Sequence, residues 1–293
     1  MKTIFTVSLL VLLLQPAPSA AVRVPDSHSE WARLTSELGE AGLPSRFLTL
    51  LPPEFVQLEF TDLKATAAEY HPAGHRMVFN LALSEGNQGR RFRPIRDISN
   101  PDLATMYHEL FHAYFDYIDL MADSARMPAQ ALRLHAEAKR LLACRYTVVN
   151  IVVGPAQKAH QRKVAVEQRR LSESEGWDAL NETWGVFVGW AIWNKLETTD
   201  RLGAAWDWDA AEKFWDRLAE AYEKGILTGY FEPTDLQARQ ILPRLYLAPS
   251  DAISLPEMAL LLEGVLEETP RMVRMALSGI DANDAEPIRR KSC

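Results

Sequence analysis

The chain of 293 residues has little of what defines several protein classes. It has only 2 cysteines and 14 glycines, which excludes a disulfide scaffold and a collagen-like protein. Basic residues are outnumbered, with 32 Lys and Arg against 39 Asp and Glu and a net charge of -7. This balance disfavours a general nucleic-acid binder, because binding to phosphates needs excess positive charge. What remains, 47% hydrophobic and 24% charged residues, is typical of a folded globular protein.

Long apolar runs are also missing. The longest one, at residues 4–14, is too short for a transmembrane helix, which needs about 20 apolar residues. It follows Lys2 and precedes a stretch of small residues around Ala20, the order seen in secretory signal peptides. We therefore predict a signal peptide at 1–20, export to a secreted or periplasmic location, and no stable membrane insertion.

The two cysteines leave two possibilities open. Export permits disulfide formation, so Cys144 and Cys293 could pair and tie down the end of the chain. They could equally remain a buried thiol and a tail thiol, since pairing does not follow from sequence.

Strand patterns come early in the chain and helix patterns late. Alternating or aromatic-rich runs predict strands at 55–60, 65–70 and 76–83, before a loop at 84–100. Helical spacing of apolar residues predicts helices at 30–40, 43–51, 101–123, 128–145, 155–171, 173–196, 207–224, 234–246, 255–268 and 269–279. This order indicates an α+β fold, mostly α, in a single domain at 21–280. Its sheet-containing part would span about 50–100 and its helical part 101–280, before a flexible tail at 281–293.

The strongest chemical signal lies in the predicted helix 101–123, which reads His-Glu-Leu-Phe-His at residues 108–112. Residues four apart share one face of a helix, so both imidazoles can reach one cation. Glu109 lies beside them, where it can bond a water rather than the metal. Zinc lowers the pKa of a bound water to about 7, and a carboxylate can then take its proton. The motif predicts a zinc site with His108 and His112 as ligands and Glu109 as general base, against the alternative of two ordinary helix histidines.

The run at 107–113 resembles the active-site helix of the zincin superfamily of zinc metallopeptidases, and the likeness extends over about 50–195. The resemblance implies a zincin-like fold: a small N-terminal sheet, an active-site helix and a helical C-terminal part. It implies one Zn²⁺ per chain and a peptide or protein substrate. It also makes the strand at 76–83 the edge strand that borders the cleft, with the peptide lying antiparallel to it.

A catalytic zinc site usually has a third protein ligand, and Glu182 is the best candidate. The pair Asn181-Glu182 resembles the start of the ligand helix in gluzincins. Gly185 and Gly189 follow on roughly the same face, and glycine inside a helix suggests close packing against a neighbouring helix. Glu182 could instead be a surface acid, with Glu167, Glu173 and Glu175 as reserve ligands. Val186 stands where thermolysin-like gluzincins carry an orienting Asp, and Ile118 where metzincins carry a third His.

Supporting residues are less well determined. Asp116 and Asp119 lie one and two turns past His112 and could accept hydrogen bonds from the imidazoles. A donor to the transition state, which a peptidase needs, could be Tyr146, His160, Tyr222, Tyr230 or Tyr246.

The sequence thus predicts an exported zinc-dependent metallopeptidase that hydrolyses peptide bonds with a metal-activated water. The alternatives are a non-catalytic exported helical binding protein with a zincin-like fold or a structural zinc site, and a zinc hydrolase that acts on an amide outside a peptide chain.

Overall fold

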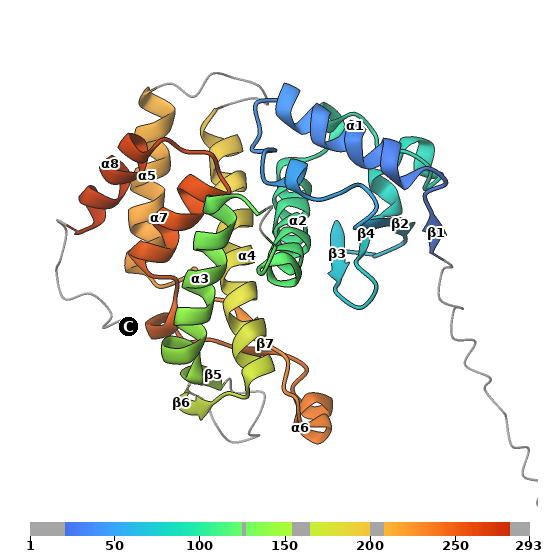
Figure 1. The fold of residues 1–293 in the computed structure, drawn as a ribbon. Coiled ribbons are helices and arrows are strands. Elements are labelled where there is room, and N and C mark those ends of the chain that lie inside the picture. Colours follow the sequence, from blue (N-terminus) through green and yellow to red (C-terminus); the bar gives the residue numbers. More distant parts are fainter. Residues whose placement is uncertain (1–20, 125–126, 154–164, 200–207, 282–293) are drawn as a thin grey trace, which may run out of the picture.

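The computed structural model describes residues 21–124, 127–153, 165–199 and 208–281. Near the N-terminus lies a four-stranded sheet with the order β1 (Val22–Arg23), β2 (Gln57–Thr61), β4 (Arg76–Asn80), β3 (Ala68–His71). β2 and β4 are parallel, and β3 pairs antiparallel with β4. Helix α1 (Ser27–Glu40) begins where Asp26 accepts a hydrogen bond from Ser29 N, and it buries its apolar stripe beside the sheet (Figure 1).

Two long helices, α2 (Asn100–Met121) and α4 (Glu173–Thr198), lie side by side at the centre of the molecule (Figure 1). α2 starts at Asn100, one residue before the predicted start at 101, and is capped by the Ser99 side chain, which accepts a hydrogen bond from Asp102 N. α4 starts with a capping box between Ser172 and Glu175. Both helices bury residues on more than one side, so the core surrounds them rather than lying along one face.

Most of the remaining elements pack against α4 or against one another. They comprise α3 (Ala129–Cys144), α5 (Trp208–Glu223), α6 (Leu236–Ile241), α7 (Leu255–Gly264), α8 (Pro270–Asp281), the hairpin of β5 (Val148–Val153) and β6 (Ala165–Arg170), and the short pair β7 (Tyr230–Phe231) and β8 (Leu245–Tyr246). Short 3₁₀ helices lie at Leu48–Leu50, Leu81–Leu83, Glu85–Asn87, Ile95–Asp97, Arg145–Thr147 and Pro249–Asp251.

The expectation of a mixed, mostly helical α+β chain is confirmed. The helix predicted at 155–171 is wrong: residues 165–170 form β6, and 154–164 lie outside the described residues. The β-branched run at 148–153, with alternate residues buried, forms its antiparallel partner. The helix predicted at 234–246 is shorter, since β8 occupies its end. The one predicted at 43–51 is reduced to a 3₁₀ turn.

The predicted edge strand is also a correction. The strand expected at 76–83 ends at Asn80 and lies inside the sheet between β2 and β3. The free edge nearest α2 therefore belongs to β3, which packs against α2. Alternation in sequence fixes the face of a residue but not the order of strands.

Three predictions concern residues that the structure does not describe. The signal peptide at 1–20, residues 282–293 of the tail, and the possible partner Cys293 of Cys144 all lie outside the described residues. Within the part of the chain that is described, no helix is both long and apolar enough to cross a membrane.

Candidate metal centre

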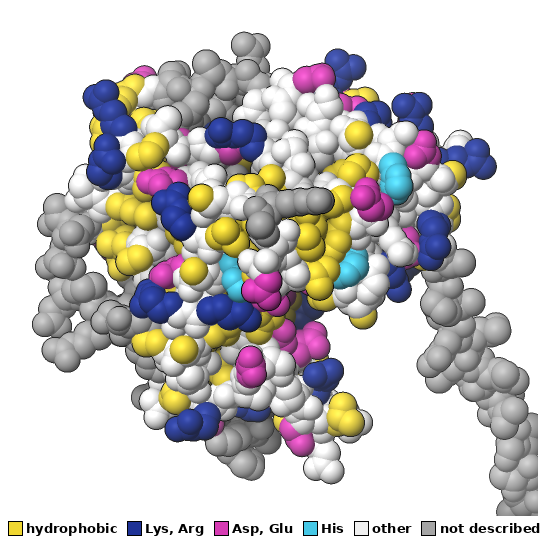
Figure 2. Space-filling view, in the orientation of Figure 1, with side chains coloured by type: hydrophobic (Ala, Val, Ile, Leu, Met, Phe, Trp, Pro, Cys, Tyr) yellow, Lys and Arg dark blue, Asp and Glu magenta, His cyan; other side chains and the backbone are white. Residues whose placement is uncertain are grey.

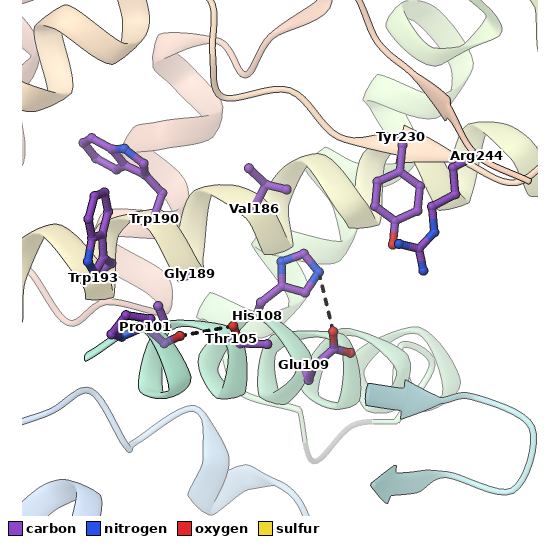
Figure 3. Close-up of a pocket in the computed structure, with 11 residues that line it drawn as sticks. Pro101, Thr105, His108, Glu109, Val186, Gly189, Trp190, Trp193, Tyr230 and Arg244 are labelled. Atoms are coloured by element: carbon purple, nitrogen blue, oxygen red, sulfur yellow. Dashed lines mark hydrogen bonds and ion pairs between the residues drawn. The ribbon is translucent and has the colours of Figure 1, made fainter. Parts of the chain in front are cut away.

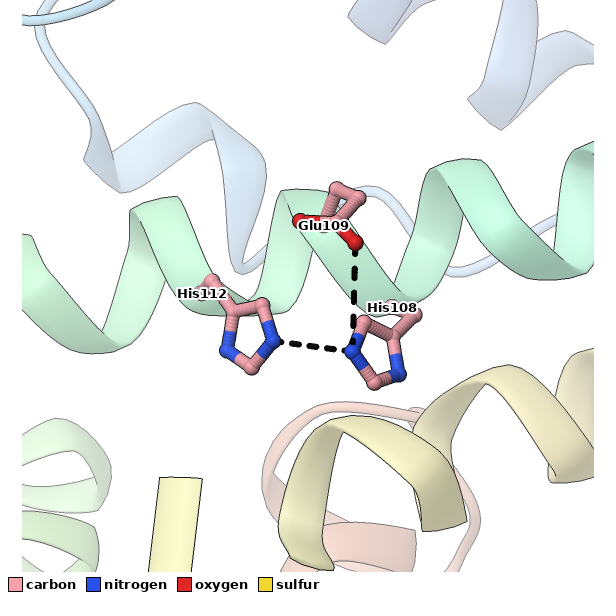
Figure 4. Close-up of side chains that lie close together, drawn as sticks. All are labelled: His108, Glu109 and His112. Carbon is pink, nitrogen blue, oxygen red and sulfur yellow. Dashed lines mark hydrogen bonds and ion pairs between the residues drawn. The ribbon is translucent and has the colours of Figure 1, made fainter. Parts of the chain in front are cut away.

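Three side chains of α2 converge on one point. His108, Glu109 and His112 each offer a ligand atom, and these atoms lie within 4.8 Å of one another. The Nε2 atoms of the two histidines are 2.9 Å apart, and their rings stand at 87° to each other (Figure 4). His112 is buried, with 6% of its surface exposed. The spacing of four residues thus brings both imidazoles to one place on the helix, as the sequence predicts.

Glu182 reaches the same point from α4. One carboxylate oxygen lies 3.2 Å from His108 Nε2, and the other lies 3.5 Å from His112 Nε2. The helices come this close because Gly185 and Gly189 face α2: a Cβ at Gly189 would stand 2.9 Å from the carbonyl oxygen of Ala104. The packing expected from the two glycines is therefore present.

The donor atoms fit a metal ion. Ligand atoms that each lie about 2.0–2.2 Å from one tetrahedral ion are roughly 3–4 Å apart, close to the separations of 2.9, 3.2 and 3.5 Å observed. Oε2 of Glu182 is buried and makes no hydrogen bond that meets normal geometry. Two imidazole nitrogens that face each other and a buried carboxylate would share a cation with little rearrangement, so this cluster could hold a metal ion.

The charges of the cluster are strongly coupled. Burial alone would lower the pKa of His112, but attraction by the Glu182 carboxylate outweighs it and raises the pKa to about 9. Burial alone would raise the pKa of Glu182, but the neighbouring imidazoles of His112 and His108 hold it well below its usual range. A carboxylate that stays ionised is what a cation site requires.

Glu109 is held differently from Glu182. Its Oε2 accepts a hydrogen bond of 2.8 Å from the backbone N–H of Tyr70 in β3, and its Oε1 lies 3.9 Å from His108 Nε2. The carboxylate therefore lies between the free edge of the sheet and the histidine pair.

The two aspartates predicted to orient the imidazoles do not contact them. Asp116 instead accepts hydrogen bonds from His75 and Tyr70. Asp119 lies 2.9 Å from His135 Nε2 and 3.3 Å from Lys139 Nζ. Both acids are on α2, but its neighbours at these positions are β3 and α3 rather than the metal cluster.

The reserve ligands lie elsewhere. Glu175 forms the capping box of α4 with Ser172, and its carboxylate also accepts a hydrogen bond from Thr234 N. Glu173 is exposed in the first turn of α4, and Glu167 is exposed on β6. None of these three belongs to the cluster of His108, Glu109 and His112.

Two cavities flank the centre. One of about 610 Å³ has His108 and Glu109 in its wall. Trp190 and Trp193 lie at one end of it, and Tyr230 at the other (Figure 3). The space-filling view shows histidine, acidic and apolar side chains meeting near the middle of the face shown (Figure 2).

The second cavity, of about 320 Å³, has His112 and Glu182 in its wall together with the acids Asp178 and Glu232. Burial, and then repulsion by Glu182 and Glu232, raise the pKa of Asp178 to about 6. One cavity is therefore mainly apolar and the other acidic, and Tyr230 lines both.

Tyr230 lies beside the candidate metal centre because the preceding residue, Gly229, packs directly on the backbone of α4. Gly229 N donates to Thr183 Oγ1, and a Cβ at Gly229 would be 2.4 Å from Thr183 N. Only glycine permits this approach, which brings β7 beside Glu182. The guanidinium of Arg244 lies 4.6 Å from the centre of the Tyr230 ring. Burial and then repulsion by Glu182 raise the pKa of the Tyr230 hydroxyl, so it stays protonated and able to donate.

From the sequence, Tyr230 is one of five candidate donors to the transition state, and no pattern in the sequence indicates a role for Arg244. Of the other candidates, Tyr146 is buried with its hydroxyl 3.5 Å from Glu257, away from the cluster, and His160 lies outside the described residues. Comparison of the chain with protein-family models, curated protein sequences and solved structures finds no match.

Proposed function

We propose that the chain is an exported zinc metallopeptidase with a zincin-like, gluzincin-type centre in which His108, His112 and Glu182 bind Zn²⁺. The observation that carries the proposal is the meeting of a His-Glu-x-x-His pair with a carboxylate from a second helix, at donor separations of 2.9–3.5 Å. Two imidazoles and one carboxylate are a ligand set of catalytic zinc, which leaves a position open for water or substrate.

Each remaining side chain then has a defined task. Bound zinc would polarise the scissile carbonyl and make an adjacent water acidic. Glu109 accepts the proton of that water as it attacks, and passes it to the nitrogen that leaves. Tyr230 lines both cavities, and its hydroxyl donates a hydrogen bond to the oxygen that gains negative charge.

The free edge of β3 supports binding of an extended peptide. Asn80 N donates to Ala67 O, so alternation along the antiparallel pair turns the N–H and C=O groups of Ala68 and Tyr70 away from β4. The Tyr70 N–H does point that way but is bonded to Glu109, so the groups of this edge left for a peptide are the N–H and C=O of Ala68 and the C=O of Tyr70. A peptide that adds to this edge would be bound mainly through its main chain and would pass the histidine pair. The larger cavity would then hold an apolar side chain of the substrate.

The test compares the parent with Glu109→Gln on a mixture of unstructured peptides, with zinc content measured for both. We expect the parent to cleave peptides. The variant should retain one zinc per chain and lose turnover by several orders of magnitude, because the amide cannot accept the proton. A zinc-bound parent that cleaves no peptide but hydrolyses small amides would favour the non-peptide hydrolase. A parent that cleaves neither would favour the binding protein. A variant as fast as the parent would refute the role of Glu109.

A further inference from the structure

A second polar cluster lies on α2, two turns beyond Glu109. Oδ2 of Asp116 accepts a hydrogen bond of 2.8 Å from Nδ1 of His75 and one of 2.5 Å from the hydroxyl of Tyr70. The hydroxyl oxygen of Tyr70 lies 3.3 Å from Nδ1 of His75. This cluster consists of side chains that the proposed reaction does not use, and it joins the sheet to the helix that carries the histidine pair.

The sheet side of the cluster is held firmly. His75 lies in the turn between β3 and β4 with a φ of 49°, an uncommon conformation for a residue with a side chain. Its ring packs on that of Phe55, with ring centres 4.2 Å apart. Tyr70 is on β3 itself, directly opposite Met77 of β4. Asp116 therefore fixes both the edge strand and the turn that follows it.

The same tyrosine contacts the proposed general base. The backbone N–H of Tyr70 donates to Oε2 of Glu109, while Tyr70's own side chain reaches Asp116. Glu109 and Asp116 are seven residues apart, which is about two helical turns and places them on one face of α2. One residue of the strand is thus attached to the helix at two points, by its main chain and by its side chain.

We propose that Tyr70 is a positioning residue. The bond of its hydroxyl to Asp116, which His75 also contacts, fixes the position of β3 along α2. In that position the Tyr70 N–H orients the Glu109 carboxylate. Oε2 is fixed by this bond, and Oε1 faces the histidine pair, 3.9 Å from His108 Nε2. The inference rests on the proposed role of Glu109 as general base. It predicts that losing a hydroxyl outside the metal cluster slows turnover without releasing the metal.

The principal variant is Tyr70→Phe, which keeps the ring and the backbone N–H and removes the bond to Asp116. Tyr117→Phe is the matched control, because Tyr117 follows Asp116 on α2 and packs against Phe55, the ring that His75 also contacts. We expect Tyr70→Phe to lower kcat about 10- to 100-fold, as misplacement of a catalytic group by about 1 Å can do, with KM and zinc content nearly unchanged. Tyr117→Phe should behave as the parent.

A readout independent of activity is hydrogen exchange at the Tyr70 amide in the full-length, zinc-loaded protein. The amide should exchange faster in Tyr70→Phe, and faster still in Asp116→Ala, which removes the acceptor for both donors. Asp116→Asn keeps one acceptor oxygen and should fall between the parent and Asp116→Ala in both kcat and exchange.

The outcomes separate this inference from the proposed function. If the parent cleaves peptides but Tyr70→Phe keeps full kcat and the parent's exchange rate, the positioning role is wrong while the proposed function stands. If the variants lose zinc or stability in step with kcat, Tyr70 and Asp116 are only structural, and the inference also fails. If the parent cleaves nothing, the proposed function fails first, and unchanged exchange in Tyr70→Phe would still refute the coupling itself.

Discussion

The ring of His112 occupies the space that a side chain at Gly185 would need. A Cβ at Gly185 would stand 2.9 Å from Cε1 of His112 and 3.0 Å from Cε1 of His108. Real Cβ atoms essentially never come as close as the first of these distances, and the second is tighter than most real contacts. The absence of a side chain at this position of α4 is therefore a condition for the histidine pair on α2 to take its geometry. The candidate metal site depends on helix packing as much as on its ligands.

Gly185→Ala should therefore damage the centre. We expect a loss of about 1–3 kcal/mol in the free energy of unfolding, typical of overpacking, and a weaker affinity for zinc. Denaturant unfolding and zinc titration measure the two effects. Gly264→Ala is the control, since the nearest atom to its Cβ would be at an ordinary 3.7 Å. Equal zinc affinity in Gly185→Ala and the parent would contradict the packing argument.

Replacement of Glu182 by Gln tests the third ligand. Loss of a group that merely orients a metal ligand costs about 10- to 100-fold in affinity, so loss of the ligand itself should cost more than about 100-fold. Competition with a chromogenic chelator gives the affinity. Glu173→Gln, an exposed acid in the first turn of the same helix, should leave zinc affinity unchanged. Tight zinc binding by Glu182→Gln would assign the third ligand elsewhere.

The pH dependence of stability in the metal-free protein follows from the same pair. The pKa of His112 is raised to about 9, so its contribution is present in full below its unfolded value near 6.5 and is lost as pH rises through 9. The pKa of Glu182 is lowered, so its contribution is present above its usual value and is lost as pH falls below that range. With chelator present, stability should decline between pH 6.5 and 9.5.

The same measurement on Glu182→Gln provides the comparison. Without the carboxylate, the pKa of His112 falls back, and we expect the decline between pH 6.5 and 9.5 to be largely removed. Urea unfolding across this range checks both curves. Parallel curves for parent and variant would show that Glu182 does not hold the proton on His112.

The larger cavity predicts a preference among substrates. Trp193 lines it and is 41% exposed, so Trp193→Ala should fold. We expect kcat/KM to fall roughly 10-fold for peptides with a large apolar residue beside the scissile bond, the order that apolar pocket contacts are worth, and to change little for alanine at that position. Trp208→Ala is a control with a more exposed ring, at 54%. An equal loss for both peptides would argue against a side-chain pocket.

The features that could be predicted from the sequence are those set by residues close together along the chain. Features set by contacts between distant segments could not be predicted in the same way. The convergence of His108 and His112 follows from helical periodicity, which is local. The approach of Glu182 was predictable because glycine inside a helix indicates a close neighbour, although the sequence alone did not exclude the reserve acids. The order of strands is not local, so the edge strand was assigned to 76–83 when it is β3.

Tertiary packing accounts for the other errors. The run at 148–153 is strongly β-branched and forms β5, yet it lies between two helical patterns, so no strand is predicted there. Tyr230 approaches the centre only because Gly229 packs on the backbone of Thr183, 46 residues away in sequence. Asp116 looked like an acceptor for the imidazoles, but sheet residues that the sequence did not place beside α2 take it instead.

The central claim is that one zinc ion is held jointly by α2 and α4, and a crystal structure of the zinc-loaded protein with anomalous data at the zinc edge tests it most directly. We predict one strong anomalous peak per chain, about 2.0–2.2 Å from Nε2 of His108, Nε2 of His112 and a carboxylate oxygen of Glu182. A peak elsewhere, or none at saturating zinc with the two histidines still facing each other, would contradict the account.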